Sequence, residues 1–202
     1  MTLSKNCAVH FAHPRGIRGA VAGVVMAHRR DYTSRGKWAM GKLEPAPDAH
    51  VLELGYGPGV TLAELCRLAP DGRVVGVDLS PVMLRQATRR TRTFVSTGLL
   101  DLRHADAADL DPELRDFDLI YGINVWQYWD DGATVIKDLA TRLRPGGRLS
   151  LAYEQPPGST VTCGRAIVQM VEQFAATPLV HVQSTWMPGH PAVLVSASRS
   201  LR

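Results

Sequence analysis

The order of strand-like and helical segments after residue 50 constrains the fold of this chain more than any other feature. Five short apolar segments read as strands, at 51–54, 73–78, 100–106, 118–125 and 148–154. Helices are expected at 60–68, from Ser80-Pro81 onward and at 131–143, where Pro145-Gly146-Gly147 breaks the last of them. Strands that alternate with helices form right-handed crossovers, so we expect a parallel sheet with helices on both faces.

The last forty residues follow a different pattern. A helix is expected at 163–175, followed by strands at 179–186 and 192–198. The link at 187–191 is short, which favours an antiparallel pair at the sheet edge. The predicted fold is therefore α/β: a doubly wound, mostly parallel, seven-stranded sheet with an antiparallel edge hairpin. Helices before Glu44-Pro45-Ala46-Pro47 are predicted to form an N-terminal cap, residues 1–45, outside a sheet domain at 46–202.

Length and cysteine content narrow the class of protein. The 202 residues, 45% of them hydrophobic, suit one globular domain with a core. The three cysteines, Cys7, Cys66 and Cys163, form no CxxC pair, which argues against a disulfide framework or a zinc site and favours a cytoplasmic location. The apolar segment 20–27 is too short to span a bilayer and a poor signal peptide, so no membrane association is expected.

The net charge of +4, with a pI of about 9.2, would by itself allow a nucleic-acid partner. The arginines are scattered, however, and the densest cluster, Arg85 to Arg92, is interpreted as the solvated face of a helix. We therefore expect no nucleic-acid partner.

A glycine-rich segment joins the first predicted strand to the helix at 60–68. It reads Gly55-x-Gly57-x-Gly59, and glycines at such a bend let the backbone approach a ligand next to the free N–H groups of a helix start. A tight strand-to-helix turn that binds no ligand would need the same glycines, so this alternative stays open. Ligands of parallel sheets bind beyond the carboxyl ends of the strands, where this segment is expected to lie.

Two neighbouring residues make the glycine segment more specific. Val60 occupies the position of the last glycine in the GxGxxG fingerprint, so the loop departs from the pattern of nicotinamide dinucleotide sites. Glu53, two residues before the first glycine, would repel an anionic pyrophosphate and attract a ligand with a cationic amino end and a sulfonium centre. Asp78 follows 19 residues after Gly59, at the end of the second strand, where an acid can accept hydrogen bonds from both ribose hydroxyls. Alone, Asp78 could be only a capping or turn residue.

Five segments carry a family resemblance: VLELGYGPG, GRVVGVDLSPVML, RHADAADL, FDLIYGINV and LRPGGRLSL. In this order and spacing, over roughly residues 50–155, the chain resembles the class I S-adenosylmethionine-dependent methyltransferases. The resemblance implies a Rossmann-like fold and S-adenosyl-L-methionine as the cofactor. It implies that the glycine loop carries the methionine end, Asp78 the ribose, and Asp106, with Ala107 beside it, the adenine amino group. It also places Asn124 near the transferred methyl group, while Leu79 and Met83 either flank the adenine or pack in the core. The cofactor residues implied are Glu53, Gly55, Tyr56, Gly57, Gly59, Asp78, Leu79, Met83, Asp106, Ala107 and Asn124.

The acceptor is constrained mainly by exclusion. Amino-methylating DNA enzymes carry an Asp/Asn-Pro-Pro-aromatic run after the fourth strand, but this chain reads Gly122-Ile123-Asn124-Val125-Trp126 there. Cytosine C5 methyltransferases need a Pro-Cys nucleophile, and no cysteine of this chain follows a proline. No acid follows Asn124 until Asp130, so no metal is expected. A small-molecule acceptor remains, with specialised metabolites among the candidates. Methyl transfer by in-line displacement needs alignment and exclusion of water. The acceptor is predicted to contact Trp126, Gln127, Tyr128 and Trp129, although these residues could instead pack the next helix.

The sequence does not select a general base. Candidates are His10, His13, Tyr32, Tyr128 and Glu154, and a strongly nucleophilic acceptor would need none. Two other functions stay open: an S-adenosylmethionine-binding enzyme of this fold that catalyses a non-methylating step such as cyclisation, and an RNA- or protein-binding module. The oligomeric state, monomer or homodimer, is also open.

Overall fold

The computed structural model describes residues 30–156 and 159–201 of the chain. Its strands are β1 (His50–Leu54), β2 (Arg73–Asp78), β3 (Leu100–His104), β4 (Phe117–Ile123), β5 (Leu143–Glu154), β6 (Leu179–Trp186) and β7 (Ala192–Arg199). Its helices are α3 (Arg30–Leu43), α4 (Val60–Leu68), α5 (Pro81–Arg90), α6 (Arg92–Ser96), the 3₁₀ helix η1 (Trp126–Tyr128), α7 (Gly132–Thr141) and α8 (Cys163–Ala175).

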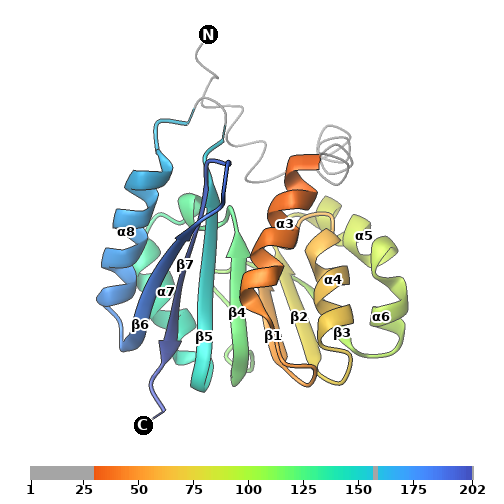
Figure 1. Ribbon diagram of the computed structural model, residues 1–202. Helices are drawn as coiled ribbons and strands as arrows, with labels where there is room; N and C mark the ends of the chain where they lie inside the picture. Colours follow the sequence, from red (N-terminus) through yellow and green to blue (C-terminus); the bar gives the residue numbers. More distant parts are fainter. Residues whose placement is uncertain (1–29, 157–158, 202) are drawn as a thin grey trace.

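The strands form one seven-stranded sheet in the order β3-β2-β1-β4-β5-β7-β6 (Figure 1). Pairing is parallel from β3 to β5, and β7 is antiparallel to both β5 and β6. The predicted Rossmann-like, doubly wound sheet with an antiparallel edge hairpin is confirmed. The chain winds outward from β1 to β3 and then resumes on the other side of β1 with β4. The space between the ends of β1 and β4 is therefore the topological switch point, where open α/β sheets bind their ligands.

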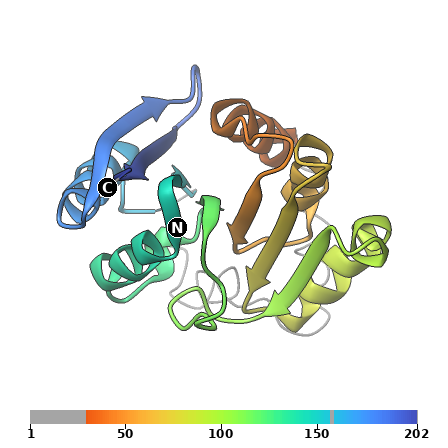
Figure 2. The ribbon, with the colours of Figure 1, turned by 90° about the horizontal axis from the view of Figure 1, so that it is seen from below.

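Each strand sends alternate side chains to the two faces of the sheet, which build separate cores. Helices lie on both sides of the sheet (Figure 2). Leu52 and Leu54 of β1 belong to a cluster that includes residues of α7 and α8. Val51, on the opposite face, belongs to a cluster that includes residues of α3, α4 and α5, with α6 side chains packed against it. Among the described residues, no helix is both long and apolar enough to cross a membrane.

Part of the predicted N-terminal cap joins this second core. Met40 and Leu43 of α3 are buried there, and α3 packs against α4. Residues 1–29 lie outside the described residues, so the proposed division of the chain at residue 45 stays a prediction.

The strand boundaries differ from expectation in one instructive place. Pro145-Gly146-Gly147 was expected to precede the fifth strand, but β5 already begins at Leu143 and contains this segment. Leu143 pairs with Phe117, and the next pair is Arg148 with Leu119, so the residues between form a bulge. Gly147 fits there because a Cβ would lie 2.5 Å from the Phe117 carbonyl oxygen. The short helix α6 (Arg92–Ser96) was not predicted as a separate element.

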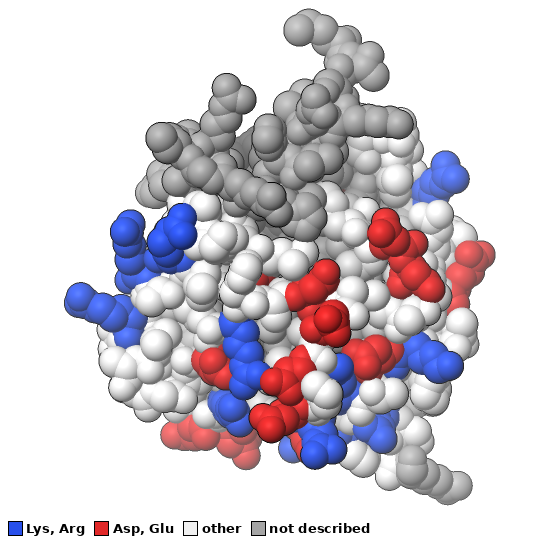
Figure 3. Space-filling view, turned by 180° about the vertical axis from the view of Figure 1, so that it is seen from behind, with Lys and Arg blue, Asp and Glu red and all other residues white. Residues whose placement is uncertain are grey.

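Surface charge is mixed on the face drawn in Figure 3, where acidic and basic side chains interleave over the lower part. Arg85, Arg89 and Arg92 are exposed and make no ion pair or hydrogen bond within the described part of the chain. Arg90 is exposed as well, as expected for a solvated face, but it also makes a contact within the fold. Its Nε donates a hydrogen bond of 2.9 Å to the carbonyl oxygen of Pro58, in the glycine loop.

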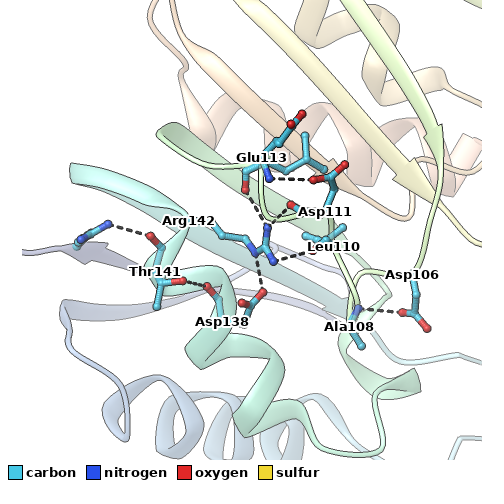
Figure 4. Close-up of polar contacts among 10 residues, drawn as sticks. Asp106, Ala108, Leu110, Asp111, Glu113, Asp138, Thr141 and Arg142 are labelled. Atoms are coloured by element: carbon cyan, nitrogen blue, oxygen red, sulfur yellow. Dashed lines mark hydrogen bonds and ion pairs between the residues drawn. The ribbon is translucent and has the colours of Figure 1, made fainter.

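The long connection from β3 to β4 contains no helix and is held by Arg142, at the end of α7 (Figure 4). Its Nη1 donates to the carbonyl oxygens of Asp111 (2.7 Å) and Leu114 (3.0 Å), and its Nη2 donates to that of Leu110 (2.9 Å). Its Nε donates to Asp138 Oδ2 at 2.6 Å, and the arginine side chain is only 11% exposed. One guanidinium thus replaces the hydrogen bonds that a helix would have supplied to this segment.

We expect Arg142→Met to destabilise the protein by about 2–4 kcal/mol, because three carbonyl groups and the Asp138 carboxylate lose a charged donor. For a domain of this size the melting temperature should fall by roughly 5–15 °C. Arg67→Met is the control, since Arg67 is 61% exposed and pairs only with Glu64 on its own helix. Urea denaturation followed by circular dichroism measures both variants, and equal midpoints would contradict the assigned role.

Candidate active site

The glycine loop, residues 55–59, lies between the carboxyl end of β1 and the start of α4. Gly55, Gly57 and Gly59 all have positive φ angles, of 67°, 52° and 78°, which other residues adopt only with strain. The amide of Gly55 donates to the Val77 carbonyl oxygen on β2 at 2.8 Å, and that of Gly59 donates to the Tyr56 carbonyl oxygen at 3.0 Å. The loop therefore turns sharply at the ligand-binding edge of the sheet.

The side chain of Val125, which follows β4, is a second reason why position 55 must be glycine. A Cβ on Gly55 would lie 2.3 Å from Val125 Cγ1, and a Cβ on Gly122 would lie 2.6 Å from Val125 Cγ2. Val125 thus packs between the ends of β1 and β4, at the switch point. Val125 was not among the predicted site residues. The sequence feature that could have indicated it is the pair Gly55 and Gly122, which make room for its side chain.

Asp78, at the end of β2, holds the glycine loop directly. Its Oδ2 accepts a hydrogen bond from the Gly57 amide and its Oδ1 accepts one from the Ser80 amide, each at 2.8 Å. Ser80 in turn caps α5, as expected, because its hydroxyl accepts from the Met83 amide at 3.3 Å. Each carboxylate oxygen has a second lone pair, so Asp78 can accept further hydrogen bonds from a ligand.

Glu53 is buried beneath the loop, with 3% of its surface exposed. Its Oε1 accepts a hydrogen bond from the Thr61 hydroxyl, while its Oε2 has no hydrogen-bond partner within the described part of the chain. Burial raises the pKa of Glu53 to about 8; the hydroxyls of Thr61 and Tyr121 act against that shift, and the nearby charge of Asp78 adds to it. Glu53 is therefore a buried acid with one oxygen left to accept a donor.

The predicted adenine-side residues gather at the ends of β2 and β3. The Ala105 amide donates to the Asp78 carbonyl oxygen at 3.2 Å, and His104 Nε2 lies 2.8 Å from the Leu79 carbonyl oxygen. Leu79 itself is 39% exposed, which is unusual for a leucine next to a buried strand. Beyond them, Asp106 Oδ1 accepts from the Ala108 amide at 2.9 Å, and Ala107 is nearly buried. The structure thus brings the predicted adenine-side residues to one edge.

Two residues predicted to contact the cofactor have their side chains in the core. Tyr56 is fully buried, and its hydroxyl donates to the Arg103 carbonyl oxygen at 3.3 Å. Gly76 on β2 makes room for it, since a Cβ there would lie 2.9 Å from Tyr56 Cδ1. Met83 is also buried and belongs to the same cluster. Core packing accounts for both side chains, and their contact with the cofactor stays a prediction.

Asn124 directly follows β4 and lies in the left-handed region, with a φ of 55°. Its Oδ1 accepts from the Glu154 amide at 2.7 Å, and its carbonyl oxygen accepts from Gln127 Nε2 at 3.1 Å. Since Oδ1 must face that amide, Asn124 Nδ2 is fixed as a donor. The side chain therefore joins the carboxyl ends of β4 and β5 beside the switch point.

The aromatic residues after β4 divide into packed and exposed ones. Trp126 is 8% exposed, and its indole Nε1 donates to Gln173 Oε1 of α8 at 2.6 Å. Its ring lies edge-on to that of Tyr153, with centroids 6.2 Å apart. Trp129 packs against the same core, whereas Tyr128 is 42% exposed. Core packing accounts for the position of the Trp126 side chain. The predicted acceptor contacts therefore rest mainly on Gln127 and Tyr128.

Two of the five candidate bases, Tyr128 and Glu154, have side chains among the described residues. His10 and His13 lie outside the described residues, and so does the side chain of Tyr32 on α3. Partial desolvation of its half-exposed side chain raises the pKa of Tyr128, which disfavours the phenolate that a base requires. Glu154 ends β5 at the carboxyl edge of the sheet, as predicted, and its backbone amide donates to Asn124 Oδ1.

A doubly wound sheet with a glycine loop after β1, an acid after β2 and a switch point between β1 and β4 defines the class of Rossmann-like domains that bind nucleoside-containing cofactors. Comparison with known proteins narrows this class. The family model described as a methyltransferase domain matches residues 51–147.

Related sequences and structures agree with that match. A trans-aconitate 2-methyltransferase of an Azoarcus species is 41% identical over 113 residues, 54% of this chain and 42% of that protein. An uncharacterised methyltransferase of Bacillus subtilis, YdaC, is 24% identical over 186 residues, 88% of this chain and 96% of that protein. The structure of geranyl diphosphate C-methyltransferase from Streptomyces coelicolor, in complex with S-adenosyl-L-homocysteine, superposes with a TM-score of 0.66 at 15% identity, covering 83% of this chain and 76% of that one.

The methyltransferase domain at residues 51–147, the related methyltransferases and the structural neighbours together support a class I S-adenosylmethionine-dependent methyltransferase. The chain spans less than half the length of several of the curated relatives that it matches. The family defines the cofactor, whereas the acceptor differs among the relatives.

Proposed function

We propose that this protein transfers the methyl group of S-adenosyl-L-methionine to a small-molecule acceptor by in-line displacement. The observation that carries the proposal is the pair of acids at the glycine loop, Glu53 and Asp78. Burial raises the pKa of Glu53 and the charge of Asp78 adds to that shift, so a cationic ligand would stabilise both carboxylates. An anionic dinucleotide would do the opposite.

The residues present fit the cofactor. The free Oε2 of Glu53 suits a donor such as the methionine ammonium group, and Asp78 suits the ribose hydroxyls. Asp106 and Ala107 would hold the adenine, with the exposed Leu79 against its face. The cofactor supplies the sulfonium-bound methyl group. The protein supplies alignment, with Asn124 and Val125 at the switch point and the loop glycines beside them.

The proposed acceptor is a small molecule bound near Gln127, Tyr128 and Glu154. The names of relatives support this class, since one acts on trans-aconitate and a structural neighbour acts on geranyl diphosphate. The interleaved charges in Figure 3 give little support to an RNA-binding module. Cytoplasmic location and the absence of a nucleic-acid partner stay parts of the proposal.

Calorimetric titration with S-adenosyl-L-homocysteine tests the cofactor assignment, and we expect a dissociation constant below the millimolar range. No binding to the folded protein would refute it. A panel of carboxylate, hydroxyl and isoprenoid acceptors, assayed for S-adenosyl-L-homocysteine release, then tests methyl transfer. Conversion of an acceptor without that release would instead favour a non-methylating enzyme of the same fold.

A further inference from the structure

We propose that Arg90 is a positioning residue for the cofactor loop, which it holds from α5 while Asp78 holds it from β2. This inference rests on the proposed function, because it concerns the loop expected to carry the methionine end of the cofactor. It assigns a role to one member of the arginine cluster that neither the family resemblance nor the sequence singled out.

The contact is to a peptide group that is held at both ends. Arg90 Nε donates to the Pro58 carbonyl oxygen at 2.9 Å, and the next amide, Gly59 N–H, donates to the Tyr56 carbonyl oxygen at 3.0 Å. These two atoms belong to one planar peptide unit, so the two bonds fix its orientation. Gly57 and Gly59, on either side of Pro58, have positive φ angles and a wide choice of conformations. The flexible part of the loop is therefore where Arg90 acts.

The last turn of α5 also abuts the loop. A Cβ on Gly59 would lie 2.9 Å from both Cα and Cβ of Ala87 and 3.6 Å from Thr91 Cγ2. Thr91 is fully buried, and its hydroxyl donates to the Ala87 carbonyl oxygen at 2.8 Å. This packing fixes the helix backbone next to the loop, so the Arg90 side chain starts from a defined position.

Asp78 and Arg90 differ in whether a bound cofactor would compete for the groups that hold the loop. Asp78 already accepts from Gly57 and Ser80 and is expected to accept from the ribose as well. Arg90 makes no other hydrogen bond or ion pair among the described residues, so its contact with Pro58 need not be shared. We infer that it preserves the loop geometry in both the free and the bound protein.

Arg90→Met removes the donor while keeping the apolar stem. Arg89→Met is the matched control, because Arg89 is exposed like Arg90 but makes no hydrogen bond or ion pair with the described residues. We expect the dissociation constant for S-adenosyl-L-homocysteine to rise about threefold to tenfold in Arg90→Met and to stay within twofold of wild type in Arg89→Met. Arg90→Lys, which keeps a donor and the charge, should recover part of the affinity.

Hydrogen exchange of the unliganded proteins separates positioning from general stability. The Gly59 amide should exchange faster in Arg90→Met than in Arg89→Met, with core strand amides unchanged. Equal affinity and equal Gly59 exchange in these two variants would overturn the inference. If wild type fails to bind the cofactor product, the proposed function fails, while the exchange of Gly59 still decides whether Arg90 holds the loop. If Arg90→Met does not fold, Arg90→Ala, which has no donor in its side chain, and Arg89→Ala take the places of the two methionine variants in the same comparison, and equal Gly59 exchange would again overturn the inference.

Discussion

Replacing Glu53 with glutamine is expected to stabilise the unliganded protein above pH 8. The folded protein holds the Glu53 proton up to a pKa of about 8, against an ordinary value of 4.5. Between these values the unfolded chain loses the proton and the folded protein keeps it, so stability falls as the pH rises through this window. Above pH 8 the buried carboxylate costs on the order of 4 kcal/mol, a cost that glutamine avoids while still accepting from Thr61.

Denaturation of wild type and Glu53→Gln at pH 5 and pH 9 measures this effect, and the difference between the two proteins should grow with pH. Glu64→Gln is the control, because Glu64 lies on α4 with its side chain 48% exposed. The same variant should bind S-adenosyl-L-homocysteine more weakly, since a neutral amide attracts an ammonium group less than a carboxylate does. A Glu53→Gln protein with the pH dependence of wild type would show that Glu53 is ionised in the fold.

Asp78→Ala is expected to cause the largest loss of cofactor affinity, at least about 30-fold, or roughly 2 kcal/mol. The variant loses the predicted ribose contact together with two hydrogen bonds that shape the site, those from Gly57 and Ser80. Asp78→Asn should retain part of the affinity, because its single carbonyl oxygen can satisfy only one of these amides.

Calorimetric titration of the three proteins, wild type, Asp78→Ala and Asp78→Asn, gives the comparison. Asp101→Ala is the control, because Asp101 is partly exposed and pairs with Arg103. The melting temperature of each variant shows whether lost affinity accompanies lost folding. Unchanged affinity in a folded Asp78→Ala protein would remove Asp78 from the cofactor site.

The cofactor half of the site was far more predictable than the acceptor half. Gly55, Gly57, Gly59 and Asp78 are tied to the backbone of a strand–loop–helix unit, and their roles follow from local conformation and spacing. The residues after β4 have no such local rule. Trp126 became a core residue because Gln173, 47 positions away, offers a partner for its indole N–H.

Long-range contacts also explain the other differences. Tyr56 is buried because Gly76 leaves space for its ring, and Pro145-Gly146-Gly147 lies in a bulge of β5 because Leu143 pairs with Phe117. Neither relation appears in a short window of sequence. Arg90 looks like its neighbours Arg89 and Arg92 until the fold brings Pro58 beside it.

The sequence by itself determined the order of strands and helices, the glycine loop and the acids at its two sides, because these depend on periodicity, on backbone freedom and on positions at strand ends. The tertiary structure decided which side chains near the loop pack in the core, and it revealed the packing of Val125 and the hydrogen bonds of Arg90 and Arg142 to backbone carbonyl groups. The physical reason is that burial and hydrogen bonding between distant segments depend on how the two faces of the sheet are covered.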